Sequence, residues 1–327
     1  MSEFFLELFS EEIPAGLQKN LREKIFEDFK NLFEEKSIRS KKNFSFSTPN
    51  RLVLVFEGLD KQIKIKSKEI RGPKTSAPEQ ALEGFLRSNK INKKDLFKKK
   101  TEKDEFYFYK TVATSLKTHD LLTEFIPKIL SNYQWKKSMK WGEFDLNWGR
   151  PLKSILSIFD KKIVSFKFHH LTSSNLTFLD KDFEEKKRSF ENFKKYEKFF
   201  EDNGVIINQN KRLKIINKSF LKILGKKGLK INENPKLIDE VVNLVDSPNV
   251  LLCKFDKKFL SVPKEILTLT MESHQKYFPT FNDKNEITNE FLIVTNKKDK
   301  KGLIKIGNER VVEARLSDAE FFWNKDK

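Results

Sequence analysis

The amino-acid sequence predicts an α/β (α+β), multi-domain protein with mixed sheets, flanking helices and a helix-rich C-terminal portion. At 327 residues the chain is long enough for two or three domains. Short apolar stretches alternate with longer amphipathic ones up to about residue 180, which favours strands between helices. Charge density rises near Asp180 to Lys187, where strand patterns stop. We therefore expect one basic region over 1–180, with a break near 115–135, and a second mixed region over 187–327.

The first elements follow from apolar periodicity. "FFLELF" is apolar on both faces and predicts a buried strand, and Pro14 begins a helix. The turn at Thr48, Pro49 and Asn50 separates two strands, "FSFS" and "RLVLVFEGL". Alternation in "QIKIKSKEI" predicts one further strand, with isoleucines on one face and lysines on the other. The apolar stripe of the helix consists of Leu17, Leu21, Ile25, Phe29 and Leu32 or Phe33.

The remaining elements are predicted in the same way. Next come a helix at "APEQALEGFLRSN", a strand at "EFYFYKTVA", a helix at "HDLLTEFIPKILSNY", a hairpin around Asp160 and a charged helix over 180–204. Two helices follow and end at Gly225 and Pro248. The last predictions are the strand "NVLLCKF", the helix "PKEILTLTMESH", a hairpin over the turn 282–285, and a final helix at "NERVVEARLSDAEFFWNKDK".

Composition indicates a polyanionic partner. The chain has 65 Lys and Arg against 47 Asp and Glu, a net charge of +18, which suits nucleic acid because phosphate contacts release counterions. A merely solvated basic surface is the alternative. The single Cys253 allows no intrachain disulfide, and no apolar run approaches the roughly 20 residues that a membrane helix needs. We expect a cytoplasmic protein that makes no membrane contact.

Self-contained catalytic chemistry is not predicted. The sequence has no P-loop and no GxGxxG motif, and "KSMKW" lacks the partner motif that a class I synthetase lysine loop would need. The four histidines show no metal-ligand spacing, and no GxSxG or Cys-His pattern supplies a nucleophile. We therefore expect no catalytic residue, no metal site and no cofactor bound by this chain.

Three clusters combine cations, planar rings and turn residues. Cations can bind RNA phosphates and planar rings can stack on its bases. The first is "EIRGPKTS", the second runs from Trp135 to Lys153 and holds three of the four tryptophans, and the third is "SHQKYFP". For the tryptophans, a local mini-core is the alternative to a contact surface. For "SHQKYFP", the alternative is a packed helix end. The candidate RNA or subunit contacts are Arg71, Lys74, Lys136, Lys137, Lys140, Arg150, His274, Lys276 and Tyr277.

At these residues the chain resembles the N-terminal half of the β subunit of bacterial heterotetrameric glycyl-tRNA synthetase. The opening "FFLELFSEEIPAGLQKNL" is similar to the family's L-x-E-[IL]-G-x-E-E-[IL]-P-A start. "TPNRL", "RGP", "EGF", "KSMKWG" with "RPLK", "HQKYFP" and "GNERVVEARLSDAEFFW" follow in the family's order. Several motifs in order over essentially the whole chain are far more specific than any one of them.

The resemblance implies that this chain binds tRNA(Gly) and supports glycylation by a separate α subunit in an α2β2 tetramer. That α subunit would carry the class II catalytic site and use ATP with magnesium, through a glycyl-adenylate. Residues 187–327 would then contact tRNA or the α subunit. We also expect the natural chain to continue beyond Lys327 into a central region and an anticodon-binding domain.

Departures from the family pattern and two rival functions complete the prediction. Ser10 stands where the opening motif has Gly, Asn50 replaces an arginine, and Asn175, Leu176 and Thr177 stand where the family has Gly-His-Arg of a GHRF stretch.

A stand-alone RNA-binding module without an aminoacylation role is the first alternative function. A hydrolase acting on mischarged tRNA ranks third, because it would need a set of catalytic residues that the sequence does not show.

Overall fold

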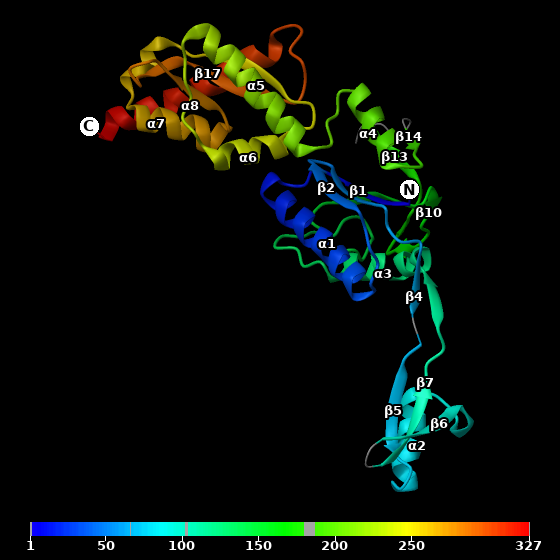
Figure 1. Cartoon of the computed structure of the whole chain (residues 1–327). Helices are drawn as coiled ribbons and strands as arrows, with labels where there is room; N and C mark the ends of the chain where they lie inside the picture. The colour runs from blue at the N-terminus through cyan, green and yellow to red at the C-terminus, as the bar shows by residue number, and fades with distance from the viewer. Residues whose placement is uncertain (1, 66, 102–103, 180–186, 327) are drawn as a thin grey trace.

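The computed structural model describes residues 2–65, 67–101, 104–179 and 187–326. Helices and small antiparallel sheets alternate along these residues, and the C-terminal part is rich in helix, so the predicted mixed architecture is confirmed. Figure 1 shows a body near the N-terminus, a second body near the C-terminus and a slender arm between residues 62 and 117. The division predicted near residues 180–187 falls largely outside the described residues and stays a prediction.

The first body is built on a five-stranded sheet whose strand order is β10-β9-β1-β3-β2. Because side chains alternate along β1, Phe4 and Leu6 face one core while Phe5 faces another. Helices α1 (Ala15–Glu35) and α3 (Thr118–Asn132) cover the first face, and α4 (Phe193–Asp202) covers the second. The strands are β1 (Glu3–Ser10), β2 (Lys42–Thr48), β3 (Arg51–Glu57), β9 (Leu152–Phe159) and β10 (Lys162–Ile163).

A buried charged group joins this sheet to α4. Glu7 and Arg51 are almost fully buried, with Arg51 Nε 3.4 Å from Glu7 Oε2, and the Tyr196 hydroxyl donates to the same carboxylate. The Arg51 guanidinium lies between two rings, 4.6 Å from the centre of Phe9 and 4.5 Å from that of Phe200. Burial raises the pKa of the Glu7 carboxyl, against the opposing effect of Arg51.

The arm begins as a two-stranded ribbon and ends in a small sheet. Strands β4 (Gln62–Ile65) and β8 (Thr114–Lys117) form the ribbon, and β5 (Glu69–Lys74), β7 (Glu105–Lys110) and β6 (Leu96–Lys100) form the sheet at its tip. Helix α2 (Glu79–Asn89) and the short 3-10 turn η1 (Lys93–Asp95) connect β5 to β6. The single strand predicted over 62–70 is therefore wrong in extent, because the chain changes partner from β8 to β7 after Ile65.

A second correction concerns the charged helix predicted over 180–204. Residues 187–189 instead form strand β14 (Lys187–Ser189), which pairs with β13 (Leu176–Phe178). The helix α4 begins only after Asn192, whose side chain accepts from the Lys195 backbone N–H as an N-cap. Residues 180–186 lie outside the described residues. The short pair β11 (Lys167–Phe168) and β12 (Leu171–Thr172) completes this part of the fold.

The second body is a three-stranded sheet, β15-β17-β16, between two layers of helix. Phe220 and Val241 of α5 (Gln209–Lys227) and α6 (Pro235–Leu244) pack on one side. The other side carries the 3-10 turn η3 (Lys257–Ser261), α7 (Lys264–Leu269), the π-helical turn η4 (Thr270–Gln275) and α8 (Leu303–Asp326). The strands are β15 (Asn249–Lys254), β16 (Phe278–Phe281) and β17 (Ile287–Thr295).

Two predicted helix ends in this body are shifted. Helix α5 continues through Gly225 and ends before Gly228, which has φ +63° and so caps the helix without a Cβ penalty. Helix α8 begins at Leu303, earlier than predicted, where the Asp299 carboxylate accepts from the backbone N–H groups of residues 304 and 305. No helix among the described residues combines the length and the apolarity needed to cross a membrane.

Candidate RNA interface

The tip of the arm presents cations and rings on one face of its sheet. In the antiparallel register Arg71 and Phe97 both pair with Phe108, and Lys99 pairs with Phe106. Because partners in a ladder share a face, these five side chains lie together. Only Arg71 among them was identified from the sequence. The alternation of aromatic and polar residues in "LFKKK" and "EFYFYK" is the signal that could have identified the other four.

Contacts within this face hold the cations over the rings. The guanidinium of Arg71 lies 3.6 Å from the centre of the Phe106 ring, and Lys99 Nζ lies 5.7 Å from that of Phe108. The rings of Phe97 and Phe108 stack at 6.0 Å, and Phe97 is 36% exposed. Lys99 also pairs with Glu69 at 2.9 Å, which lowers the pKa of that exposed carboxylate. The face is thus an ordered mixture of cations and flat apolar surface.

Lys74 lies beside this face and is half exposed. Its ammonium group is 2.7 Å from Asp104 and 6.0 Å from the Phe106 ring centre. Residues 62–117 contain fifteen Lys and Arg against seven Asp and Glu, so the arm remains strongly basic after such pairing. A basic surface with exposed rings can bind phosphates through its cations and unpaired bases by stacking.

The tryptophan-rich segment divides into two parts. Trp148 is 2% exposed and packs against Trp135 at 5.0 Å between ring centres, and Tyr133 packs on Trp135 at 4.9 Å. The mini-core interpretation is confirmed for these two tryptophans. Trp141 packs against the same core but makes a different ring contact, 5.8 Å from His170.

The predicted cations of this segment lie on the surface around it. Lys136, Lys137 and Lys140 are exposed, and Lys140 lies 4.0 Å from the exposed Asp145. Arg150 is half-buried and donates to the carbonyl of Gly149 at 2.7 Å. Arg150 also lines a hollow of about 480 Å³ where the first body meets α6; the hollow is further lined by Glu11, Glu12, Ile13, Pro14, Pro49, Asn243 and Leu244.

The "SHQKYFP" corner is a packed turn. Lys276 has φ +60° and pairs with Glu240 at 3.0 Å, while the Tyr277 hydroxyl donates to Asn308. The Tyr277 ring stacks on Phe291 at 5.4 Å, and burial raises the pKa of its hydroxyl to about 12. His274 is exposed. Lys276 and Tyr277 therefore have partners within the chain, and an RNA contact by any of the three stays a prediction.

The three clusters do not form one site. Figure 1 shows β5, which carries Arg71 and Lys74, at the far tip of the arm, whereas α7 and α8 lie at the opposite end of the molecule with the third cluster. The tryptophan-rich segment belongs to the first body, between them. Any single RNA that contacted all three would have to extend along the molecule.

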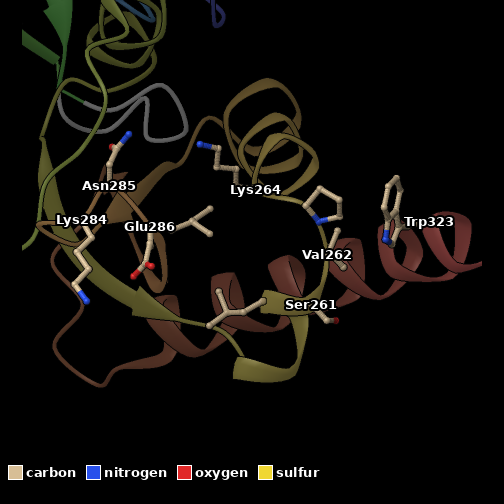
Figure 2. Close-up of a pocket in the computed structure, with 10 residues that line it drawn as sticks. Ser261, Val262, Lys264, Lys284, Asn285, Glu286 and Trp323 are labelled. Carbon is tan, nitrogen blue, oxygen red and sulfur yellow. The ribbon is translucent and has the colours of Figure 1, made fainter. Parts of the chain in front are cut away.

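A hollow in the second body has no cluster of reactive groups among the residues that line it. It encloses about 630 Å³ between the start of α7, the β16–β17 turn and α8, and Figure 2 shows Glu286 and Trp323 on opposite sides of it. Lys264 and Lys284 also line it, so its charge is mixed. Among the residues that the structure describes, no group of three or more His, Cys, Asp or Glu side chains could hold a metal ion.

Comparisons with known proteins agree with the order of motifs in the chain. The sequence model of the family described as glycyl-tRNA synthetase beta subunit matches residues 4–327. A glycine–tRNA ligase beta subunit from Rickettsia felis is 38% identical over 329 residues, covering 100% of this chain and 49% of the relative. Those from Rickettsia conorii and Rickettsia bellii are 39% identical over 327 residues, covering 100% of this chain and 49% and 50% of the relatives. The chain spans about half the length of the curated relatives it matches, and it belongs to the glycyl-tRNA synthetase beta subunit family.

Proposed function

We propose that this chain is the tRNA-handling part of a glycine–tRNA ligase beta subunit. It binds tRNA(Gly) and supports ATP-dependent glycylation, while the class II catalytic site lies on a separate α subunit. The observation that carries the proposal is the family match over residues 4–327. The lack of a predicted nucleotide-binding motif in this sequence is compatible with such a division of labour.

The arm is the proposed primary RNA contact. Arg71, Lys74 and Lys99 take phosphates, and the exposed ring of Phe97 offers a surface on which a base can stack. Lys136, Lys137 and Lys140 provide a second group of phosphate contacts on the first body. Both groups are exposed cations on ordered segments, so RNA can reach them without rearrangement of the fold.

The partners follow from the same proposal. The chain works in an α2β2 tetramer with the α subunit, in the cytoplasm, and ATP with magnesium is used at the α subunit. This chain itself binds no cofactor. Arg150, His274, Lys276 and Tyr277 are proposed as further contacts, to tRNA or to the α subunit.

Glycine charging tests the function directly. The protein carrying this chain is assayed for charging of tRNA(Gly) with and without the α subunit from the same genome. We expect charging only when both are present. If both proteins are folded and the α subunit forms glycyl-adenylate, but the mixture charges no tRNA, the ligase proposal is wrong and a stand-alone RNA-binding module is favoured.

Salt-dependent binding tests the arm. The triple variant Arg71→Ala, Lys74→Ala, Lys99→Ala should lower tRNA affinity about tenfold and reduce the salt slope by about two to three, because up to three phosphate contacts are lost. A matched control removes three exposed lysines from α5 and should leave affinity within about twofold. The control residues are Lys214, Lys218 and Lys222. Equal losses in the two triple variants would mean that only net charge matters, and that the arm is not the contact.

A further inference from the structure

A small ring-lined pocket lies on the first body, away from the arm. It encloses about 280 Å³ and is formed by segments that are far apart in the sequence: β1, the segment after Trp135, the start of β9, the β11–β12 turn and β13. Its lining residues are Phe9, Trp141, Phe144, Leu152, Lys153, His170, Leu171 and Phe178. Five of these eight side chains are planar rings, and that composition sets this pocket apart from the mixed-charge hollow of the second body.

The rings are arranged as two stacked pairs. Phe9 and Phe178 stack at 5.6 Å between ring centres with an interplanar angle of 23°. Phe144 and His170 stack at 3.7 Å with an angle of 7°, and Trp141 meets His170 edge-on at 5.8 Å. Flat, nearly parallel surfaces of this kind favour a flat guest, because a planar ring contacts them over its whole face.

One side of the pocket is fixed and the other is open. Phe9 and Leu152 are each 1% exposed, and the guanidinium of Arg51 packs behind Phe9 at 4.6 Å. Phe144, in contrast, is 43% exposed. A ligand would therefore enter past an accessible ring and meet a well-packed apolar floor.

His170 adds a polar edge to this wall. Burial, together with the neighbouring His169, lowers the pKa of His170, which favours the neutral form of its ring. Its Nδ1 atom is buried and has no hydrogen-bond partner among the described residues. An uncharged ring stacks on a flat ligand without the cost of desolvating a charge.

Cations lie at the rim. Lys153 lines the pocket and pairs with Glu11 at 2.6 Å, and Lys187 Nζ lies 5.3 Å from the centre of the Phe178 ring. The exposed Lys140 is one residue away from Trp141 along the chain. Positive groups beside flat apolar walls are what a nucleotide requires, since its base is planar and its phosphate is anionic.

We propose that this pocket accepts one unpaired nucleobase of tRNA, with Lys153 and Lys187 at the adjoining phosphates. The proposal deepens the proposed function and rests on it, because it names a second contact for the same RNA. A pocket of about 280 Å³ is at the lower limit of small-molecule sites and suits a single base. An aromatic side chain of a partner protein would fit the rings, but it would leave the rim cations without a role.

The test uses tRNA(Gly) transcripts in which 2-aminopurine replaces one unpaired base, with a separate transcript for the 3′ end and for each loop. Stacking on protein rings quenches 2-aminopurine fluorescence. We expect the 327-residue chain to quench one transcript, and the Phe144→Ala variant to lose most of this quenching and to bind about tenfold more weakly. Phe144→Leu keeps apolar volume without a flat ring and should show the same loss. The control Phe44→Ala, at an aromatic residue that is 38% exposed and does not line the pocket, should behave as wild type.

The outcomes separate the two proposals. If the wild-type chain binds no transcript, the proposed function fails, and the pocket proposal fails with it. If it binds tRNA but quenches no transcript, or if Phe144→Ala and Phe144→Leu keep full quenching, only the pocket proposal is overturned. Normal tRNA binding by Phe144→Ala with weakened α-subunit association would also overturn it, because the pocket would then hold a protein side chain.

Discussion

Gly149 shows how one residue can decide local packing. A Cβ atom at this position would lie 2.1 to 2.7 Å from the ring of Trp135, closer than atoms can approach, so the tryptophan mini-core needs glycine there. Gly225 is the opposite case. It lies inside α5, a Cβ would meet nothing within 4 Å, and glycine costs helix stability through backbone entropy.

These two glycines give a paired prediction. Gly149→Ala should lower the free energy of unfolding by about 2 kcal/mol, because Trp135 must move away from Trp148. Gly225→Ala should raise the free energy of unfolding by about 0.5 to 1 kcal/mol. Urea unfolding followed by tryptophan fluorescence measures both. If Gly149→Ala proved as stable as wild type, the close packing of Trp135 would be refuted.

At the scale of elements, Arg212 connects α5 to the rest of the molecule. Its side chain is fully buried and donates to four backbone carbonyls, those of Ser47, Ile206, Ile207 and Val242. The Ser47 carbonyl belongs to the first body, at 2.7 Å, and Val242 belongs to α6. Burial lowers the pKa of the guanidinium to about 10, so it remains charged at neutral pH.

We predict that Arg212→Met will lower the free energy of unfolding by about 3 kcal/mol or more, because four buried carbonyls lose their donor. Lys214→Met on the same helix removes an exposed cation and should change stability by less than about 0.5 kcal/mol. Chemical denaturation of the two variants makes the comparison. Similar midpoints for the two variants would mean that Arg212 does not hold α5 in place.

Element prediction succeeded where one periodic stripe meets one core. Ile25 and Phe29 of the predicted stripe of α1 are fully buried, and Leu17 packs at the edge of the same core. It failed where pairing with another strand, and not the local pattern, decides the conformation. "KRS" at 187–189 carries no strand pattern, yet it pairs with Leu176–Phe178. Local periodicity cannot reveal a partner that tertiary contacts supply.

At the scale of the whole molecule, the arm forms a separable unit. Lys68 and Thr111 are joined by two hydrogen bonds where the ribbon meets the tip sheet: the Thr111 N–H donates to the Lys68 carbonyl at 2.9 Å, and the Lys68 N–H donates to the Thr111 hydroxyl at 2.7 Å. Residues 69–110 lie between Lys68 and Thr111 and contain β5, α2, β6 and β7. Among the described residues, the three strands pair only with one another. A two-residue hairpin turn could bridge this pair.

We predict that replacing residues 69–110 by Asn-Gly will leave the melting temperature of the remaining chain within about 3 °C of wild type, because the two main bodies keep their cores. Affinity for tRNA should fall about tenfold or more, and the salt slope should decrease, because the basic tip is lost. Calorimetry and binding at several salt concentrations measure both quantities. Unchanged affinity and slope would exclude the arm as an RNA contact.

The sequence by itself determined the mixed architecture, most helices and strands, the basic character and, through its ordered motifs, the family. These features depend on local periodicity, composition and residue order, which a chain carries whether or not it is folded. Only the tertiary structure decided which motif residues meet. It separated Arg71 from Tyr277, placed Trp135 in a mini-core and brought Trp141 beside Phe178 in a pocket. Such contacts join residues far apart in the sequence, so they arise from the packing of sheets and helices and not from any local pattern.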